Sequence, residues 1–371
     1  MSAGPRFLPA LLLLFLGSGA AALIYEIIWL QMLQLVIGSS AVSLAVLLGS
    51  FMGGMCLGSL LLPRLVDPSR HPLKVYAALE AGIALSGLLV LFAMPAVGHV
   101  YTTLVGHGFS GTLLRAVVCM VCLLPPTVLM GATLPAIARW IESNPRGVAW
   151  LGFFYGGNTV GAVAGCLLAG FYLLRLHDIA TATLVAVTLN LAVAFVAYAL
   201  ARSAAYRARI PAPATSALSP LAGTTTEPAV PPAIILTAIG ISGMCALAAE
   251  VIWTRNLSLR LGATVYTFSI ILAVFLIGLG LGSSLGATLA RDYSRPRLLL
   301  ALSQFLQVGA IAWAAWMISG SLPHWPIEPG THASASVKFQ LDLVRCAWAI
   351  LPSAFLWGAS SPLALACTVT S

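Results

Sequence analysis

Two glutamates lie inside apolar stretches that are long enough to cross a membrane. Glu26 occurs in the segment LIYEIIWLQMLQLVIGSS, and Glu250 occurs in the segment LAAEVIWTRNLSLRLGAT. A carboxylate inside a membrane-spanning helix costs at least about 2.5 kcal/mol on insertion scales. We therefore expect both acids to face the interior of a helix bundle or a water-filled cavity.

Two carboxylates beside aromatic side chains suit an organic cation or a proton. Trp29 and Trp253 follow the two acids by three residues, which places each on the same helical face as its glutamate. The candidate substrate-binding residues are Glu26, Trp29, Tyr25, Glu250, Trp253 and Asn158. The alternative is structural: Arg255 or a hydroxyl group neutralises the acids, and Asn158 hydrogen-bonds between helices. Glu80 is a further candidate.

The surroundings of the first glutamate recur around the second, and the residue numbers differ by 224 each time. The identical pairs are Glu26 and Glu250, Trp29 and Trp253, Gly38 and Gly262, and Gly58 and Gly282. The segment LPPTVLMGATLP around Gly131 also matches LPSAFLWGASSP around Gly358, at an offset of 227. Four identities at one spacing indicate an internal repeat.

The composition is that of a membrane protein. Of the 371 residues, 60% are hydrophobic and only 8% are charged, whereas a soluble domain carries about 25% charged residues. The net charge of +8 does not indicate a nucleic-acid partner, because the basic residues are scattered in short loops between apolar runs. The seven cysteines all fall inside apolar segments, where we interpret them as small hydrophobic residues. We expect no metal site and no cofactor.

The apolar runs predict an all-α polytopic protein with about ten transmembrane helices in two parallel repeats. Residues 1–202 form a first six-helix repeat, and residues 203–232, rich in Pro, Ala, Ser and Thr, form a cytoplasmic linker. Residues 233–371 form a second, truncated repeat of four helices. The third helix is expected to run from Val75 to Met94.

Glycines spaced four residues apart predict faces where neighbouring helices approach closely. The candidate helix-packing residues are Gly54, Gly58, Gly157, Gly161, Gly165, Gly278, Gly282 and Gly286. The sequence stops where counterparts of two further helices would begin. We therefore expect a further membrane subunit, or a missing C-terminal part, to cover the second repeat.

Loop charges predict the orientation of the chain. Basic residues recur in alternate loops, for example at Arg64, Arg139 and Arg291, and such loops stay in the cytoplasm. The N-terminus is therefore expected in the cytoplasm.

Four segments carry a resemblance to a known family. LIYEIIWLQMLQLVIGSS (residues 23–40) and LAAEVIWTRNLSLRLGAT (247–264) resemble the membrane region of bacterial fused major-facilitator/spermidine-synthase proteins. LPPTVLMGATLPAIARW (124–140) and FFYGGNTVGAVAG (153–165) fit the same family. The resemblance implies a major-facilitator-like membrane domain joined to a Rossmann-like aminopropyltransferase domain. It also implies a location in a bacterial inner membrane.

That enzyme domain would use decarboxylated S-adenosylmethionine and a polyamine, but its glycine-rich nucleotide loop does not occur in this sequence. Whether the protein takes part in catalysis is therefore open. The expected function is a transporter-like membrane protein that handles a cationic amine such as a polyamine. The alternative is a membrane anchor or scaffold associated with a spermidine-synthase-like enzyme or with a larger membrane complex.

Overall fold

The described part of the chain is helical, and it contains ten helices long and apolar enough to cross a membrane and no β-strand. The structure is a computed structural model. It describes residues 8–38, 40–67, 69–104, 109–142, 151–203, 206, 231–262, 264–293, 295–325 and 335–369. Residues 204–205 and 207–230 of the expected linker lie outside this part.

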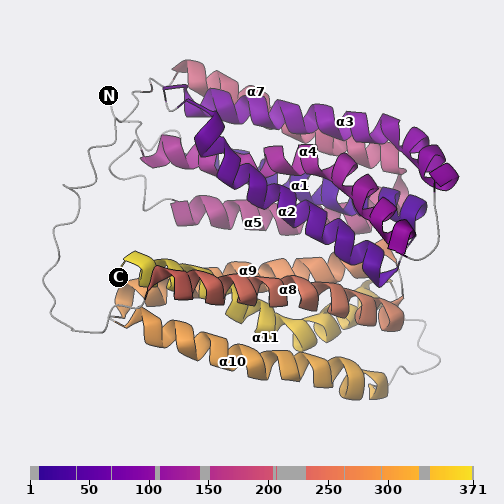
Figure 1. The fold of residues 1–371 in the computed structure, drawn as a ribbon, viewed down its shortest axis with the longest axis vertical. Coiled ribbons are helices and arrows are strands. Elements are labelled where there is room, and N and C mark those ends of the chain that lie inside the picture. Colours follow the sequence, from indigo (N-terminus) through magenta and orange to yellow (C-terminus); the bar gives the residue numbers. More distant parts are fainter. Residues whose placement is uncertain are drawn as a thin grey trace, which may run out of the picture.

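The helices of the first half are α1 (Leu8–Ile37), α2 (Ala41–Leu65), α3 (Pro72–Leu104), α4 (Phe109–Glu142), α5 (Leu151–Leu168), α6 (Leu174–Leu176) and α7 (Ile179–Ser203). A π-helical turn, Ala169–Leu173, joins α5 to α6. The second half contains α8 (Pro232–Leu261), α9 (Val265–Asp292), α10 (Pro296–Trp316) and α11 (Ala335–Val369). Figure 1 shows α1 to α7 in one group and α8 to α11 in the other, with their long axes side by side.

The turn between α1 and α2 has the same construction as the turn between α8 and α9. Gly38 and Gly262 follow the first helix of each pair with φ of 84° and 105°, values that favour glycine. Ser40 and Thr264 then cap the second helix, because each side-chain oxygen accepts a hydrogen bond from the backbone N–H three residues on (3.1 and 3.3 Å). Both pairs of residues are 224 positions apart.

Glycines bring α2 against α4. A Cβ atom on Gly54 would meet Thr127, and one on Gly58 would meet the backbone carbonyl of Val128. In the opposite direction, Gly131 of α4 faces the backbone of α2. The two helices therefore touch backbone to backbone, an approach that any side chain at these positions would prevent.

The contact between α9 and α11 uses equivalent residues. Gly282 faces the carbonyl of Phe355, and Gly358 faces the carbonyl of Leu279. Gly278 and Gly286 lie against Ala354 and Ala359. The residue numbers in α9 are 224 higher than those of the equivalent residues in α2, and the numbers in α11 are 227 higher than those in α4.

The third glycine face joins α5 to α1. Gly157, Gly161 and Gly165 lie against Leu12, Leu16 and Ala20. This contact holds α1 in the middle of the first half, and 67% of its most apolar stretch is buried.

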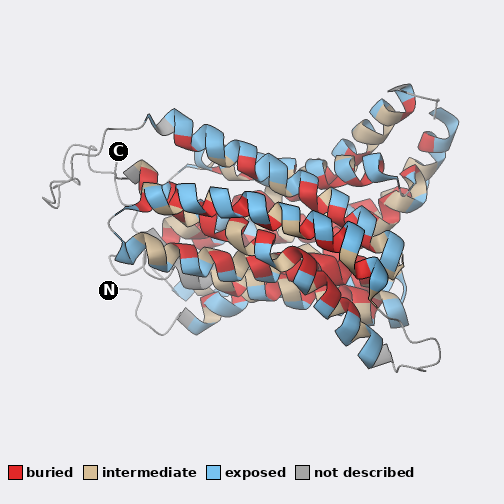
Figure 2. Cartoon of the chain, turned by 90° about the horizontal axis from the view of Figure 1, so that it is seen from below, coloured by how far each residue is buried: buried red, intermediate tan, exposed pale blue. Residues whose placement is uncertain are grey.

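The outer surface is apolar, as a lipid environment requires. Phe92, Phe195 and Phe305 are 76%, 73% and 75% exposed. Figure 2 shows exposed residues along the outer faces of the helices and buried residues where helices face one another. Apolar side chains this exposed would be unfavourable in water but not in a bilayer.

Helix α3 is longer than the sequence predicts. The expected end is Met94, but the helix continues through Pro95 to Leu104. Proline removes only one backbone donor, and the surrounding backbone groups remain bonded within the helix, which is the arrangement that an apolar phase favours.

Candidate functional site

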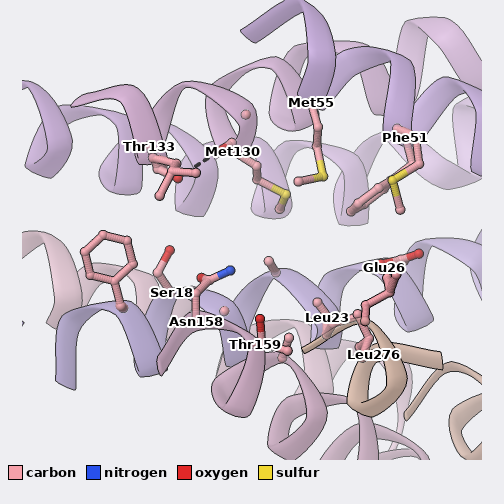
Figure 3. A pocket seen from close by; sticks show the side chains of 18 of the residues that line it. Ser18, Leu23, Glu26, Phe51, Met55, Met130, Thr133, Asn158, Thr159 and Leu276 are labelled. Carbon is pink, nitrogen blue, oxygen red and sulfur yellow. Dashed lines mark hydrogen bonds between the residues drawn. The ribbon is translucent and has the colours of Figure 1, made fainter. Parts of the chain in front are cut away.

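A cavity of about 450 Å³ is lined mostly by helices of the first group, and α8 and α9 of the second group complete its wall. Figure 3 shows side chains of α2 and α4 facing those of α1 and α5 across it. One stripe of α1 forms a wall along its length: Phe15, Ser18, Gly19, Ala22, Leu23 and Glu26. Helices α2, α4, α5 and α9 supply most of the remaining wall. These helices are the ones that the glycine contacts hold in place, so the cavity is built on the most tightly packed part of the fold.

The two repeated glutamates meet at this cavity. Glu26 and Glu250 both line it and are only 2% and 4% exposed. Within the described residues, Oε1 of Glu26 is buried without a hydrogen-bond partner. A buried carboxylate oxygen of this kind is a costly feature that a bound cation would compensate.

Equivalent residues of the two halves face the cavity together. Four pairs line it at the constant offset of 224: Glu26 and Glu250, Phe51 and Phe275, Met52 and Leu276, and Met55 and Leu279. The cavity wall therefore contains matching residues from the two halves, both acidic and apolar.

Tyr25 and Trp29 are placed behind the wall and do not line the cavity. Their rings are stacked 4.8 Å apart, and both side chains are fully buried. Trp29 also contacts Phe51, with ring centroids 6.4 Å apart, and Phe51 does line the cavity. These aromatic residues thus support the wall from α1.

Trp253 has a similar place in the second half. It is 4% exposed and contacts Trp357 at 5.6 Å between ring centroids. Trp357 in turn contacts Phe275, a cavity residue, at 6.1 Å. The two repeated tryptophans therefore lie behind the two repeated phenylalanines of the cavity wall. Trp29 contacts Phe51 directly, whereas the ring of Trp357 lies between Trp253 and Phe275.

Asn158 lines the cavity from α5. Figure 3 shows it near Ser18 and Thr133, at the other end of the view from Glu26. Its backbone carbonyl lies against Gly19, so it also takes part in the close contact between α1 and α5. The polar and packing roles considered for Asn158 are compatible with this position.

Sequence reasoning missed two polar partners of Glu80. Ser18 donates a hydrogen bond from its hydroxyl to Oε1 of Glu80 (2.6 Å), and Asn190 donates from Nδ2 to Oε2 (2.7 Å). Ser18 and Asn190 line the cavity, whereas Glu80 is fully buried behind them. The signal in the sequence is an acid inside an apolar helix, but its partners are 62 and 110 residues away.

Beyond the acids the two halves are closed. Ile27, Leu30 and Phe268 are buried there, and they also line a second, smaller cavity of about 140 Å³ on the far side. This second cavity is polar, with Gln31, Gln34, Ser40, Thr254, Arg255, Ser258 and Thr264 in its wall. In the other direction the wall of the main cavity includes Leu134, which is 39% exposed.

Among the described residues, no group of three His, Cys, Asp or Glu side chains is arranged to hold a metal ion. Comparison of the sequence with protein-family models finds no match, and comparison with curated proteins also finds none. The candidate function therefore has to be argued from the cavity itself.

Proposed function

We propose that this protein is a transporter-like membrane protein that handles a cationic amine, and that Glu26 and Glu250 form its cation site. The supporting observation is the main cavity, which both acids line and where Oε1 of Glu26 is buried without a partner among the described residues. An ammonium group has three donors and a positive charge, so two carboxylates can both accept hydrogen bonds from it.

The repeat supports a transporter in particular. In parallel-repeat transporters, substrate binds near the middle of the membrane at the interface between the repeats. Four repeated residue pairs around one cavity, and equivalent glycine contacts in the two halves, fit a major-facilitator-like arrangement. The buried layer of Ile27, Leu30 and Phe268 would then be the closed side of an alternating-access cycle.

The proposed location is a bacterial inner membrane with the N-terminus in the cytoplasm. Arg64, Arg139 and Arg291 lie in the last turns of α2, α4 and α9, at the same end of the bundle as the start of α1. Basic residues at helix ends favour the cytoplasmic side. The more exposed end of the main cavity would then face the cytoplasm.

The proposed substrate class rests on the acids and on the resemblance of residues 23–40 and 247–264 to fused major-facilitator/spermidine-synthase proteins. A scaffold that carries nothing is the competing proposal. It requires each carboxylate to be neutralised inside the protein, and the unpartnered oxygen of Glu26 weighs against it.

The test is uptake of radiolabelled amine into proteoliposomes that contain the purified protein. We expect uptake above that of empty liposomes, and we expect Glu26→Gln and Glu250→Gln each to reduce it at least about tenfold. That factor corresponds to about 1.4 kcal/mol, the lower end of the value of a hydrogen bond to a charged group.

The matched control is Asp67→Asn, which removes one acid from an exposed loop that does not line the cavity. Uptake by this variant should equal that of the wild type. Uptake that is unchanged in both glutamine variants would refute the cation site, and absence of uptake and of amine binding in the wild type would favour the scaffold.

A further inference from the structure

The first half contains a buried carboxylate that the second half lacks. The position equivalent to Glu80 is occupied by Gln304, whose amide donates a hydrogen bond to Ser360 (2.8 Å). The second half therefore has an uncharged residue at this position, and its partner is on α11. Because a charge within a membrane is costly, its presence in one half alone suggests a functional role.

Glu80 controls which atoms its two partners offer to the cavity. The Ser18 hydroxyl and the Asn190 amide each donate a hydrogen to the carboxylate, so their own oxygens remain as acceptors. Asn190 is 2% exposed, and its Oδ1 has no hydrogen-bond partner within the described residues. This part of the cavity wall thus combines acceptor oxygens of Ser18 and Asn190 with a carboxylate directly behind them.

The cluster and the glutamate pair lie at two levels of one cavity. Ser18 and Glu26 are on the same stripe of α1, eight residues apart, which corresponds to about 12 Å along the helix. Figure 3 shows them at opposite ends of the view, with Met55 and Met130 on the facing wall between them. Ala22 and Leu23 continue this apolar middle section on α1.

We propose that Ser18, Glu80 and Asn190 form a second ammonium subsite, so that the ligand is an elongated aliphatic dication. One charged end would bind at Glu26 and Glu250, and the other at the Glu80 cluster. The methylene chain would lie against the apolar middle section. This inference rests on the proposed cation site and adds a requirement for two charges at a defined separation.

The separation selects a chain length. With bonds near 1.5 Å, an extended aliphatic chain advances by roughly 1.25 Å per bond, so nine bonds advance about 11 Å, close to the roughly 12 Å between the two levels. Octane-1,8-diamine has this length. Butane-1,4-diamine reaches only about half of it, so it can occupy one subsite at a time.

The experiment measures binding of three probes to purified protein in nanodiscs by isothermal titration calorimetry. The probes are octane-1,8-diamine, butane-1,4-diamine and 8-aminooctan-1-ol, the last having the same length as the first but a single charge. We expect the wild type to bind octane-1,8-diamine at least about tenfold more tightly than either of the other two, a difference of about 1.4 kcal/mol.

In the variant Glu80→Gln, the affinity for octane-1,8-diamine should fall to the affinity for 8-aminooctan-1-ol. The affinity for 8-aminooctan-1-ol should be the same as in the wild type. Glutamine occupies the equivalent place in the second half, so it is the mildest replacement. Ser18→Ala is a second variant that should reduce the same preference without removing a charge. The matched control is Asp178→Asn, which removes an acid from an exposed position and should leave all three affinities unchanged.

Equal affinity of the wild type for the two eight-carbon probes would overturn the second subsite but leave the proposed cation site intact. The same conclusion follows if both variants keep the preference for the diamine. If no probe binds to the wild type, the proposed cation site itself fails. Loss of all binding together with a lower melting temperature in both variants would assign Glu80 a structural role.

Discussion

The contact of α2 with α4 gives a sharp prediction about stability. In Gly58→Ala, the new Cβ atom would meet the backbone carbonyl of Val128 and would also lie 3.0 Å from the backbone nitrogen of Ala132. Backbone atoms cannot turn aside as the end of a side chain can. The two helices would have to separate, so we expect this single methyl group to destabilise the protein.

The matched control is Gly53→Ala, five residues earlier on the same helix. No atom lies within 4 Å of the position that its Cβ would take. Both substitutions gain about 1 kcal/mol of helix propensity, which cancels when the variants are compared. The remaining difference is the overpacking term, and we expect Gly58→Ala to be less stable than Gly53→Ala by about 1–3 kcal/mol.

The free energy of unfolding can be measured for both variants by titration with SDS in mixed micelles, and thermal unfolding in one detergent provides a second readout. Gly282→Ala should behave like Gly58→Ala, because Gly282 meets the carbonyl of Phe355 in the same way. Equal stability of Gly53→Ala and Gly58→Ala would refute the backbone contact between α2 and α4.

Three further outcomes are expected. Asp178 caps the start of α7, and hydrogen bonds from the side chain and the backbone N–H of Thr181 hold its pKa below the ordinary value. The cap therefore stabilises α7 at a pH above the ordinary carboxyl pKa, and this stabilisation is lost as the pH falls through the lowered pKa. The melting temperature of Asp178→Asn should depend less on pH in that acid range than the melting temperature of the wild type. Gly38→Val should lower the melting temperature more than Gly38→Asn, because φ there is 84° and asparagine tolerates that region better. Cys56 is exposed and lines the cavity, whereas Cys119 is buried. A water-soluble maleimide should therefore modify a variant that retains only Cys56 much faster than a variant that retains only Cys119. Equal rates would mean that water does not reach Cys56 in the cavity.

Several features can be predicted from local sequence. Apolar runs of sufficient length predict about ten spanning helices, and the described residues contain ten. The offset of 224 singles out Glu26 and Glu250 by residue type and spacing alone, and both line one cavity. The expected end of α3 is wrong, because a proline in an apolar run does not have to terminate a membrane helix and α3 continues past Pro95.

The direction in which each helix face points cannot be deduced from the sequence. In a soluble protein, polar residues mark the face of a helix that points away from the core. In a bilayer the surroundings are as apolar as the core, so α1 is apolar on all sides and its pattern does not indicate a direction. The sequence therefore places Tyr25 and Trp29 beside the acids in the site, and only packing puts them behind Phe51.

Length, hydropathy and repeated residues are properties of the chain itself, so the sequence alone determined the membrane class, the number of spans and the pairing of Glu26 with Glu250. The tertiary structure decided which side chains line the cavity and which lie behind it. It also decided that Asn190 meets Glu80 across 110 residues of sequence. Such contacts depend on how each helix is rotated about its axis, and close packing at glycines sets that rotation through contacts with distant segments.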